Sequence, residues 1–438
     1  MKTRAKRLVG LVTVTAAVAV LVSACGGGAG GGGTGGGGNG GGNGGGGNDG
    51  GGTSPTIAVD VQGAVWVAYQ DGANGSWRTL APSGGFSGSV PSTAPDGRYS
   101  LAFVCPGDKL TVRVVHATRQ ELPSVNFSCA STPSTTVTVS GTVSGLAPGG
   151  IAIVSVGSES VNTSGSYDIP SIPVGTYNVI AVRFTGNVPN RVWLRRDLEF
   201  SENRIYNIDF EQPNDPLARV FAVSSGELTV SGTTVNETVT ARLLFQSGTR
   251  ASIIGLGANV GLAAPTTYPI FPREEVRDTE QFRVLVETSE ERGLVQVLDT
   301  LPSSLTLTLP PLYENPTLSA SGTGAVQFTA QNLAYSDSPV VGYQLSASTS
   351  SGTRRYEYFI TAGWLGNANT YTTPVLETLA GWNSAWSLQR GETTDVRLRV
   401  YVSPSGATPQ AVWSYLQGNP APSGFILHYA TRRQTLTP

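Results

Sequence analysis

The chain has few charged residues and few of the side chains on which catalysis and metal binding usually depend. Of its 438 residues 13% are charged, three are cysteines and two, His116 and His428, are histidines. It contains no Gly-x-Ser-x-Gly, His-Glu-x-x-His or P-loop motif, the signatures of common hydrolases, metalloproteases and nucleotide-binding proteins. A serine–histidine triad would have only these two histidines from which to take its base. We predict no catalytic residue, no metal site and no cofactor.

The balance of charges provides no basic surface for nucleic acid. The formal charge is −2, and without the four basic residues before Cys25 it becomes −6, from 24 basic and 30 acidic residues. Proteins that bind nucleic acid concentrate lysine and arginine on one face. Residues 26–53 are nearly all glycine but lack the lysine and the preceding strand of a phosphate-binding loop. We expect neither nucleic-acid nor nucleotide binding.

The first 25 residues contain the three parts of an export signal. Basic residues come first, an apolar run over 8–22 follows, and small residues lead to the cysteine in Leu21-Val22-Ser23-Ala24-Cys25. The apolar run of about 15 residues is shorter than the roughly 20 that a spanning helix needs. The layout resembles the signal of bacterial lipoproteins. An ordinary secretory peptide or a retained membrane helix, with Cys25 incidental, is the alternative.

This resemblance implies a lipid anchor on Cys25. The thiol would receive a diacylglycerol, residues 1–24 would be removed, and the new amino group would be open to acylation with a fatty acid such as palmitate. Two acyl chains give stable membrane attachment. Gly26 stands where a retention aspartate for the inner membrane would be, which favours the outer membrane in a diderm host. The folded part would then lie in the periplasm or at the cell surface.

Residues 26–53 are expected to form a disordered tether. Glycine loses more backbone freedom on ordering than other residues and has no side chain to bury. A flexible run of this length has a root-mean-square span of roughly 30 Å. The tether would hold the folded part clear of the lipid surface.

Beyond the tether, the pattern is that of β-strands, and no segment shows a convincing helical pattern. In residues 396–402 valine and leucine alternate with arginine and tyrosine, which is typical of a half-buried strand. Asp71-Gly72, Asn74-Gly75 and Asp96-Gly97 are turn signals between such runs. We therefore predict an all-β protein made of tandem antiparallel β-sandwich modules of Ig-like or transthyretin-like type.

One segment carries a more specific pattern. Ser164-Gly165-Ser166-Tyr167-Asp168-Ile169-Pro170 is followed by Ile172-Pro173-Val174-Gly175-Thr176-Tyr177-Asn178-Val179, and this resembles the transthyretin-like, carboxypeptidase-regulatory-type sandwich. That resemblance implies a spacer or accessory domain with no catalytic residues. Residues 65–72 with Trp77 also resemble uncharacterised exported lipoproteins. The predicted organisation is a signal peptide (1–24), a lipidated cysteine with its linker (25–54), a disulfide-bonded sandwich (55–133), the transthyretin-like sandwich (134–213), a β-rich domain (214–312) and an aromatic-rich β domain (313–438).

Cys105 and Cys129 are the two cysteines of the part that would be exported. In an oxidising compartment they are expected to form a disulfide. The alternative is a metal site that also uses His116, which lies between them in the sequence.

Two groups of residues are candidate sites. Trp382 and Trp386 lie in a Gly/Asn-bearing stretch and would suit a flat sugar-binding platform, although large aromatics also fill sandwich cores. Residues 273–292 mix seven acids with four arginines, and paired carboxylates perform glycoside hydrolysis when held a set distance apart. Because the arginines alternate with the acids, a solvated loop or short helix with surface ion pairs is the favoured interpretation.

The sequence thus favours a membrane-anchored envelope or surface lipoprotein with a non-enzymatic binding or structural role. Its expected partners are the membrane, through Cys25, and an envelope protein or a glycan. A glycan-binding protein that uses Trp382 and Trp386 is the first alternative. A carboxylate-dependent hydrolase is the second.

Overall fold

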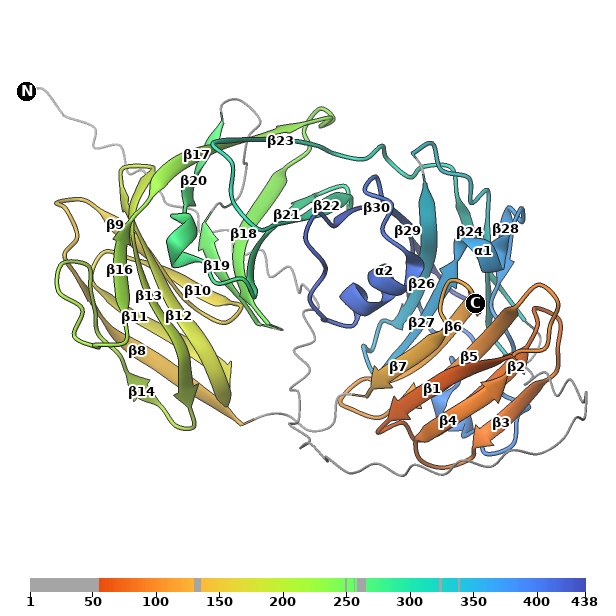
Figure 1. The fold of residues 1–438 in the computed structure, drawn as a ribbon. Coiled ribbons are helices and arrows are strands. Elements are labelled where there is room, and N and C mark those ends of the chain that lie inside the picture. Colours follow the sequence, from red (N-terminus) through yellow and green to blue (C-terminus); the bar gives the residue numbers. More distant parts are fainter. Residues whose placement is uncertain are drawn as a thin grey trace, which may run out of the picture.

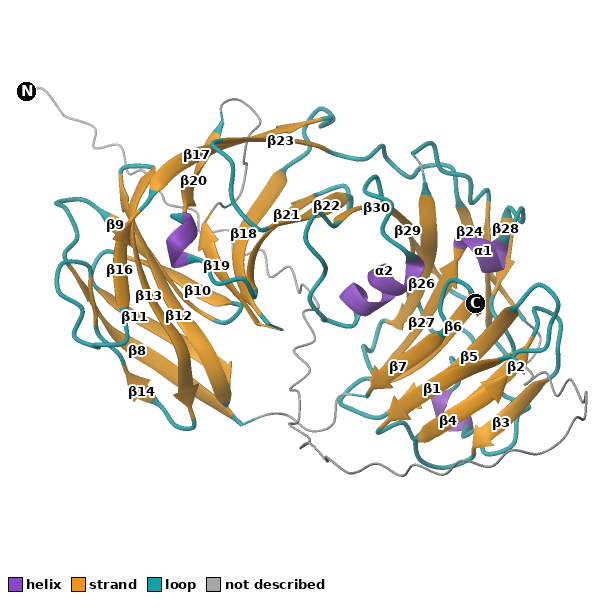
Figure 2. Ribbon diagram, viewed as in Figure 1, coloured by secondary structure: helices purple, strands orange, loops and turns teal. Residues whose placement is uncertain are grey.

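The protein is almost entirely β-structure, as the sequence predicted (Figures 1 and 2). The computed structural model describes residues 55–129, 135–248, 250–255, 257, 265–322, 325–337 and 339–438. The predictions for Cys25, the signal and the glycine-rich tether lie outside these residues. The strands form sheets that pack face to face as sandwiches.

A twelve-stranded sheet runs through most of the molecule (Figure 1). Its strands come from three separate parts of the sequence. In spatial order they are β19 (Arg250–Gly255), β18 (Val239–Ser247), β21 (Glu280–Thr288), β22 (Gly293–Leu298), β30 (Ile426–Leu436), β29 (Thr394–Val402), β26 (Val340–Thr349), β27 (Arg354–Thr361), β6 (Leu110–Thr118), β5 (Arg98–Cys105), β2 (Trp66–Asp71) and β3 (Trp77–Ala81).

Two strand pairs make this sheet continuous. β27 pairs in parallel with β6, so that Glu357 lies opposite Arg113 although the two are far apart in the sequence. β22 pairs antiparallel with β30, with Gly293 opposite Tyr429. The first and last parts of the chain are therefore joined by backbone hydrogen bonds.

Smaller sheets cover both faces of the part of this sheet around β2, β5, β6 and β27. On one face β4 (Phe86–Pro91), β1 (Thr56–Gln62) and β7 (Ser124–Ser128) bury Val59 and Val125 against Leu101 and Phe103. On the other face β24 (Thr317–Ser321), β25 (Gln327–Gln331) and β28 (Thr370–Thr372) belong to the core that holds Trp66. Strand alternation supplies a different set of apolar side chains to each face.

Three further sheets come from residues 136–308, outside the strands of the twelve-stranded sheet. A five-stranded sheet of β10 (Glu159–Thr163), β9 (Ile151–Val156), β12 (Gly175–Thr185), β13 (Val188–Phe200) and β16 (Arg219–Ala222) packs on a smaller one of β11 (Ser166–Pro173), β8 (Thr136–Ser144), β14 (Arg204–Ile205) and β15 (Ile208–Asp209). A three-stranded sheet of β20 (Thr266–Ile270), β17 (Ser224–Ser231) and β23 (Ser304–Thr308) shares a core with β18 and β21.

Two short α-helices occur in the described residues although the sequence shows no convincing helical pattern. They are α1 (Ala362–Leu365) and α2 (Pro409–Leu416), and there are 3-10 turns η1 (Arg273–Glu275) and η2 (Ser384–Trp386). Thr408 caps α2 by accepting a hydrogen bond from the Ala411 N–H, and Pro409 stands at its first position. Both are standard start signals for a helix.

Candidate functional site: an arginine-lined cavity

A cavity of about 150 Å³ lies between helix α2 and the central sheet. Strands β6, β26, β27 and β29 form its floor, and α2 lies beside β26 (Figure 1). Its polar lining consists of Arg113, Gln344, Arg355, Glu357, Arg399, Tyr401 and Gln417, and its apolar lining of Val114, Val115, Phe359, Trp413 and Leu416.

The strand register explains why polar groups meet at this point. β29 reads Thr-Asp-Val-Arg-Leu-Arg-Val-Tyr-Val, so Arg399 and Tyr401 share a face while the leucine and valines face the opposite core. Gln344 of β26 pairs with Arg399 on one side and with Phe359 of β27 on the other. Alternate residues of four adjacent strands thus line the cavity. The alternation in β29 was read correctly from the sequence, but nothing local in the sequence shows which strands lie next to it.

The cavity carries more positive than negative charge. The Glu357 carboxylate lies 2.8 Å from Arg113 Nη1 and 2.7 Å from Arg355 Nη2. Arg399 instead donates from Nε to the Thr431 hydroxyl at 3.0 Å and has no carboxylate ion-pair partner among the described residues. Three guanidinium groups therefore face one carboxylate.

Aromatic rings hold two of these arginines in place. The Arg113 guanidinium lies 4.5 Å from the centre of the Phe127 ring, and that of Arg399 lies 4.5 Å from the Tyr429 ring. Such contacts favour the cation over the ring face and restrict the guanidinium plane. An arginine that is already positioned loses less conformational freedom when it binds an anion.

Helix α2 supplies the apolar cover of the cavity. Trp413 is 5% exposed, and its ring packs 5.3 Å from Phe359 and 6.4 Å from Phe127 between ring centres. Tyr401 donates a hydrogen bond of 2.7 Å to Gln344 Oε1. That bond uses the acceptor of the Gln344 amide and not its N–H donors.

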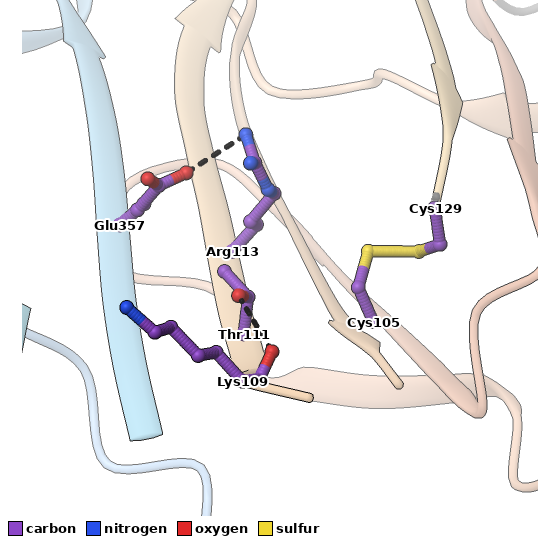
Figure 3. Close-up of a disulfide and its surroundings, with 6 residues drawn as sticks. All are labelled: Cys105, Lys109, Thr111, Arg113, Cys129 and Glu357. Atoms are coloured by element: carbon purple, nitrogen blue, oxygen red, sulfur yellow. Dashed lines mark hydrogen bonds and ion pairs between the residues drawn. A yellow bond between two sulfur atoms is a disulfide. The ribbon is translucent and has the colours of Figure 1, made fainter. Parts of the chain in front are cut away.

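The predicted disulfide between Cys105 and Cys129 is confirmed, with 5.2 Å between the two Cα atoms. Figure 3 shows it on the strand next to Arg113, whose side chain extends toward Glu357. The bond joins the end of β5 to the residue that follows β7, the strand of Phe127. Both thiols are used, so the alternative metal site at these cysteines does not form.

The acids of residues 273–292 are mostly engaged with arginines. Glu275 pairs with Arg219 at 2.8 Å, and the buried Glu280 pairs with Arg196 at 2.6 Å. The predicted loop or short helix is wrong beyond η1, because strand β21 begins at Glu280 and buries Phe282, Val284 and Val286. These three residues stand at alternate positions in the sequence, as in a half-buried strand, but the many charges around them led to the prediction of a loop or short helix.

Trp382 and Trp386 lie together, half-buried, with Trp66 as a third ring that the sequence did not indicate. The centres of Trp382 and Trp386 are 5.3 Å apart at 82°, and those of Trp66 and Trp382 are 5.2 Å apart at 86°. Trp382 Nε1 also donates to Ser387 Oγ at 3.0 Å. These edge-to-face contacts pack the rings against the core and do not arrange them as a flat platform.

The two histidines occupy unlike positions. His116 lies inside β6, 2% exposed, between Ser100 Oγ at 2.7 Å and the Tyr371 hydroxyl at 2.8 Å. Burial lowers its pKa to about 3. His428 is half-buried, with Nδ1 3.3 Å from Asp337. Ser100 is completely buried, so the Ser100–His116 pair has no route to a substrate.

Within the part of the chain that the structure describes, no helix is long and apolar enough to cross a membrane. No group of His, Cys, Asp and Glu side chains suited to a metal ion is found among the same residues.

Comparisons with known proteins yield only distant similarities. No protein-family model and no curated protein matches the chain. The FN1-FN3 domains of chicken CNTN1 are 8% identical, cover 66% of this chain and 91% of their own, and give a TM-score of 0.16. A Ca²⁺-stabilized adhesin with which an Antarctic bacterium binds ice is 9% identical, with 86% and 90% coverage and a TM-score of 0.16. Similarity at this level carries no argument about function.

Proposed function

We propose that this protein is a lipid-anchored lipoprotein of the bacterial envelope that binds an anionic ligand without transforming it. The observation that carries the binding role is the cavity beneath α2, where three arginines face a single carboxylate. A partly buried site of this kind attracts anions more strongly than exposed arginines do, because less water screens the charges.

The lining favours binding over catalysis. It offers guanidinium, amide and phenol donors, which hold an anion but do not form a nucleophile with an adjacent base. Glu357, the carboxylate of the cavity, is bridged by Arg113 and Arg355. Each of its two oxygens is therefore occupied by a guanidinium group.

The anchor follows from the sequence. The segment that ends at Cys25 and the glycine-rich stretch after it would display the folded part at a distance from the lipid surface. A folded part with a built cavity, held near the membrane by the proposed anchor, suits capture of a ligand there. An envelope protein or a glycan that carries acidic groups is a partner of the expected class.

Anchoring is tested by expressing the full-length chain in a bacterial host and separating membrane from soluble fractions. The mature protein should carry diacylglycerol on Cys25 by mass spectrometry and remain with the membranes. Cys25→Ala should instead accumulate with residues 1–24 attached. Cleavage of the Cys25→Ala chain and its release as a soluble protein would refute the lipoprotein assignment.

Binding is tested on the mature protein in mild detergent by following its thermal unfolding with acetate, phosphate or sulfate in place of chloride at equal ionic strength. A ligand that binds only the folded state raises the midpoint. At least one of these anions should raise it by a few degrees, and Arg399→Gln should abolish the rise. No rise with any anion would refute the binding role.

A further inference from the structure

We infer that the ligand of this cavity is a carboxylate attached to a small apolar group, as in a branched-chain acid or at the end of a polypeptide with an aliphatic last residue. The inference rests on the proposed binding role and specifies its ligand. It is drawn from the charge, the size and the apolar half of the cavity.

Unused donor capacity indicates where the anion would lie. Arg399 has no carboxylate within ion-pair distance among the described residues; its Nε is bound to Thr431 and its guanidinium also meets the Tyr401 hydroxyl, with Glu287 farther away. The remaining N–H donors of its terminal amino groups are available to an anion. Arg355 Nε is buried and finds no hydrogen-bond partner in the described part of the chain. Buried donors are nearly always paired, so one without a protein partner indicates a site for a ligand or water. The planar fork of a guanidinium matches a carboxylate in two parallel hydrogen bonds.

The volume limits what enters. A cavity of about 150 Å³ is of the size that holds benzene when it is engineered into a protein core. It therefore admits roughly six to eight non-hydrogen atoms, counted from that comparison. A carboxylate group that carries three or four further carbon atoms fits this volume, whereas a complete acidic sugar ring does not. A larger ligand would have to insert only its end.

The apolar half selects among small anions. Val115, Phe359 and Leu416 line the cavity together with Trp413. Leu416 is half-buried, and Phe359 and Trp413 keep 4% and 5% of their surface exposed, so the apolar surface left for a ligand to cover is small. Phosphate and sulfate have no apolar part, so binding them would leave this surface in contact with water. An aliphatic group would remove it from water at about 25 cal/mol per Å² of buried apolar area. A carboxylate with an aliphatic group uses both halves.

The test is calorimetric titration of the mature full-length protein in mild detergent with four probes. Isovalerate represents the free acid, Ala-Ala-Val the end of a polypeptide, Ala-Ala-Val amide the same peptide without its charge, and inorganic phosphate an anion without an apolar part. We expect isovalerate or Ala-Ala-Val to bind at least tenfold more tightly than both the amide and phosphate. The tighter of those two identifies the source of the carboxylate.

Variants link the signal to the cavity. Arg399→Gln should weaken the better carboxylate at least tenfold, and Arg399→Lys, which keeps the charge but not the fork, should weaken it less. Arg432→Gln is the matched control, because Arg432 is an exposed arginine on the adjacent strand β30 and does not line the cavity. This variant should bind the better carboxylate with unchanged affinity. If Arg399→Gln fails to fold, Arg399→Lys and Arg432→Gln still make the comparison.

Two results would overturn the inference. Binding of the amide that is as tight as that of both Ala-Ala-Val and isovalerate would show that the carboxylate is not recognised. Phosphate binding that is tighter than either carboxylate and is lost in Arg399→Gln would preserve the anion-binding role but refute the ligand class. Failure of all the anions would refute the proposed binding role as well.

Discussion

His116 is a buried histidine that the surrounding residues keep neutral, and it should set the response of the protein to mild acid. Burial lowers its pKa from 6.5 to about 3. The unfolded chain takes up a proton on this ring below pH 6.5 but the folded protein only near pH 3, so stability is lost as the pH falls through this interval. We expect the free energy of unfolding to fall by about 1.4 kcal/mol per unit between roughly pH 6 and pH 5.

Chemical denaturation at a series of pH values measures this slope. His116→Asn should remove it, at the cost of lower stability at neutral pH, because the bridge between Ser100 and Tyr371 is broken. His428→Asn replaces the other histidine, which is half-buried, and should keep the slope. If the free energy of unfolding of His116→Asn still falls with pH at the same rate, another titrating group causes the dependence.

The ring contacts of Trp382 predict a role in stability. Its edge-to-face contacts with Trp66 and Trp386 and its bond to Ser387 would all be lost in Trp382→Ala. We expect the free energy of unfolding to drop by about 2 kcal/mol, below the 3–5 kcal/mol typical of fully buried tryptophan because the ring is half-buried. Trp382→Phe should recover part of this loss. Normal stability with lost binding on a glycan array would instead support the sugar-binding alternative.

At the scale of elements, the sequence predicted strands well and their neighbours poorly. The alternation over 396–402 correctly indicated β29, since a half-buried strand has a local period of two. The parallel pairing of β6 with β27 has no such local signal, because it depends on residues far apart in the chain. Helix α2 was missed although Thr408-Pro409 is a good start signal, because its eight residues are too few to show a helical period.

The candidate site shows the same contrast between local features, which the sequence reveals, and contacts between distant residues, which it does not. The Cys105–Cys129 bond was predicted because the part after the tether has no other cysteine to choose from. The cavity was missed because Arg113 lies on β6, far in the sequence from β27 and β29, the strands of Arg355 and Arg399. Each arginine alone reads as a solvent-facing residue of an alternating strand. Only the strand order brings them together.

The disulfide should support both stability and the cavity. It closes a loop with a sequence separation of 24, for which the chain-entropy model gives about 3 kcal/mol. It also fixes the end of β7, whose Phe127 contacts the Arg113 guanidinium. We expect the double variant Cys105→Ser, Cys129→Ser to lose about that much stability and to bind the preferred carboxylate several-fold more weakly.

Denaturation and calorimetric titration measure the two effects, with the titration made well below the unfolding midpoint. Val161→Ala, on the outlying strand β10, provides a control with a change far from the cavity. It should leave the affinity unaltered. Full affinity in the folded double serine variant would show that Phe127 needs no disulfide to stay in place.

At the scale of the whole molecule, the first part of the chain (residues 55–129) and the last part (residues 313–438) should unfold together, because strand pairing and shared cores join them. The first core contains residues of β1, β5 and β7 together with Tyr401 and Tyr429, and the second contains Trp66 and Val114 together with Leu345 and Val400. Both cores therefore combine residues from the first and last parts of the chain, and neither part has a complete core of its own. Residues 137–218 share one core among themselves, and the opposite face of β12 and β13, with Ile180 and Val192, packs in the core that contains β18 and β21.

Val114→Ala tests this coupling, because Val114 is 1% exposed in β6, opposite Tyr358 of β27. Removing its two methyl groups should lower stability by about 2 kcal/mol. Native-state hydrogen exchange followed by mass spectrometry should show this decrease equally in β5, β26 and β29, since these strands belong to one cooperative unit. Amides of β9 and β8 should keep their protection. A decrease confined to residues 55–129 would mean that the parallel pairing joins two units that open independently.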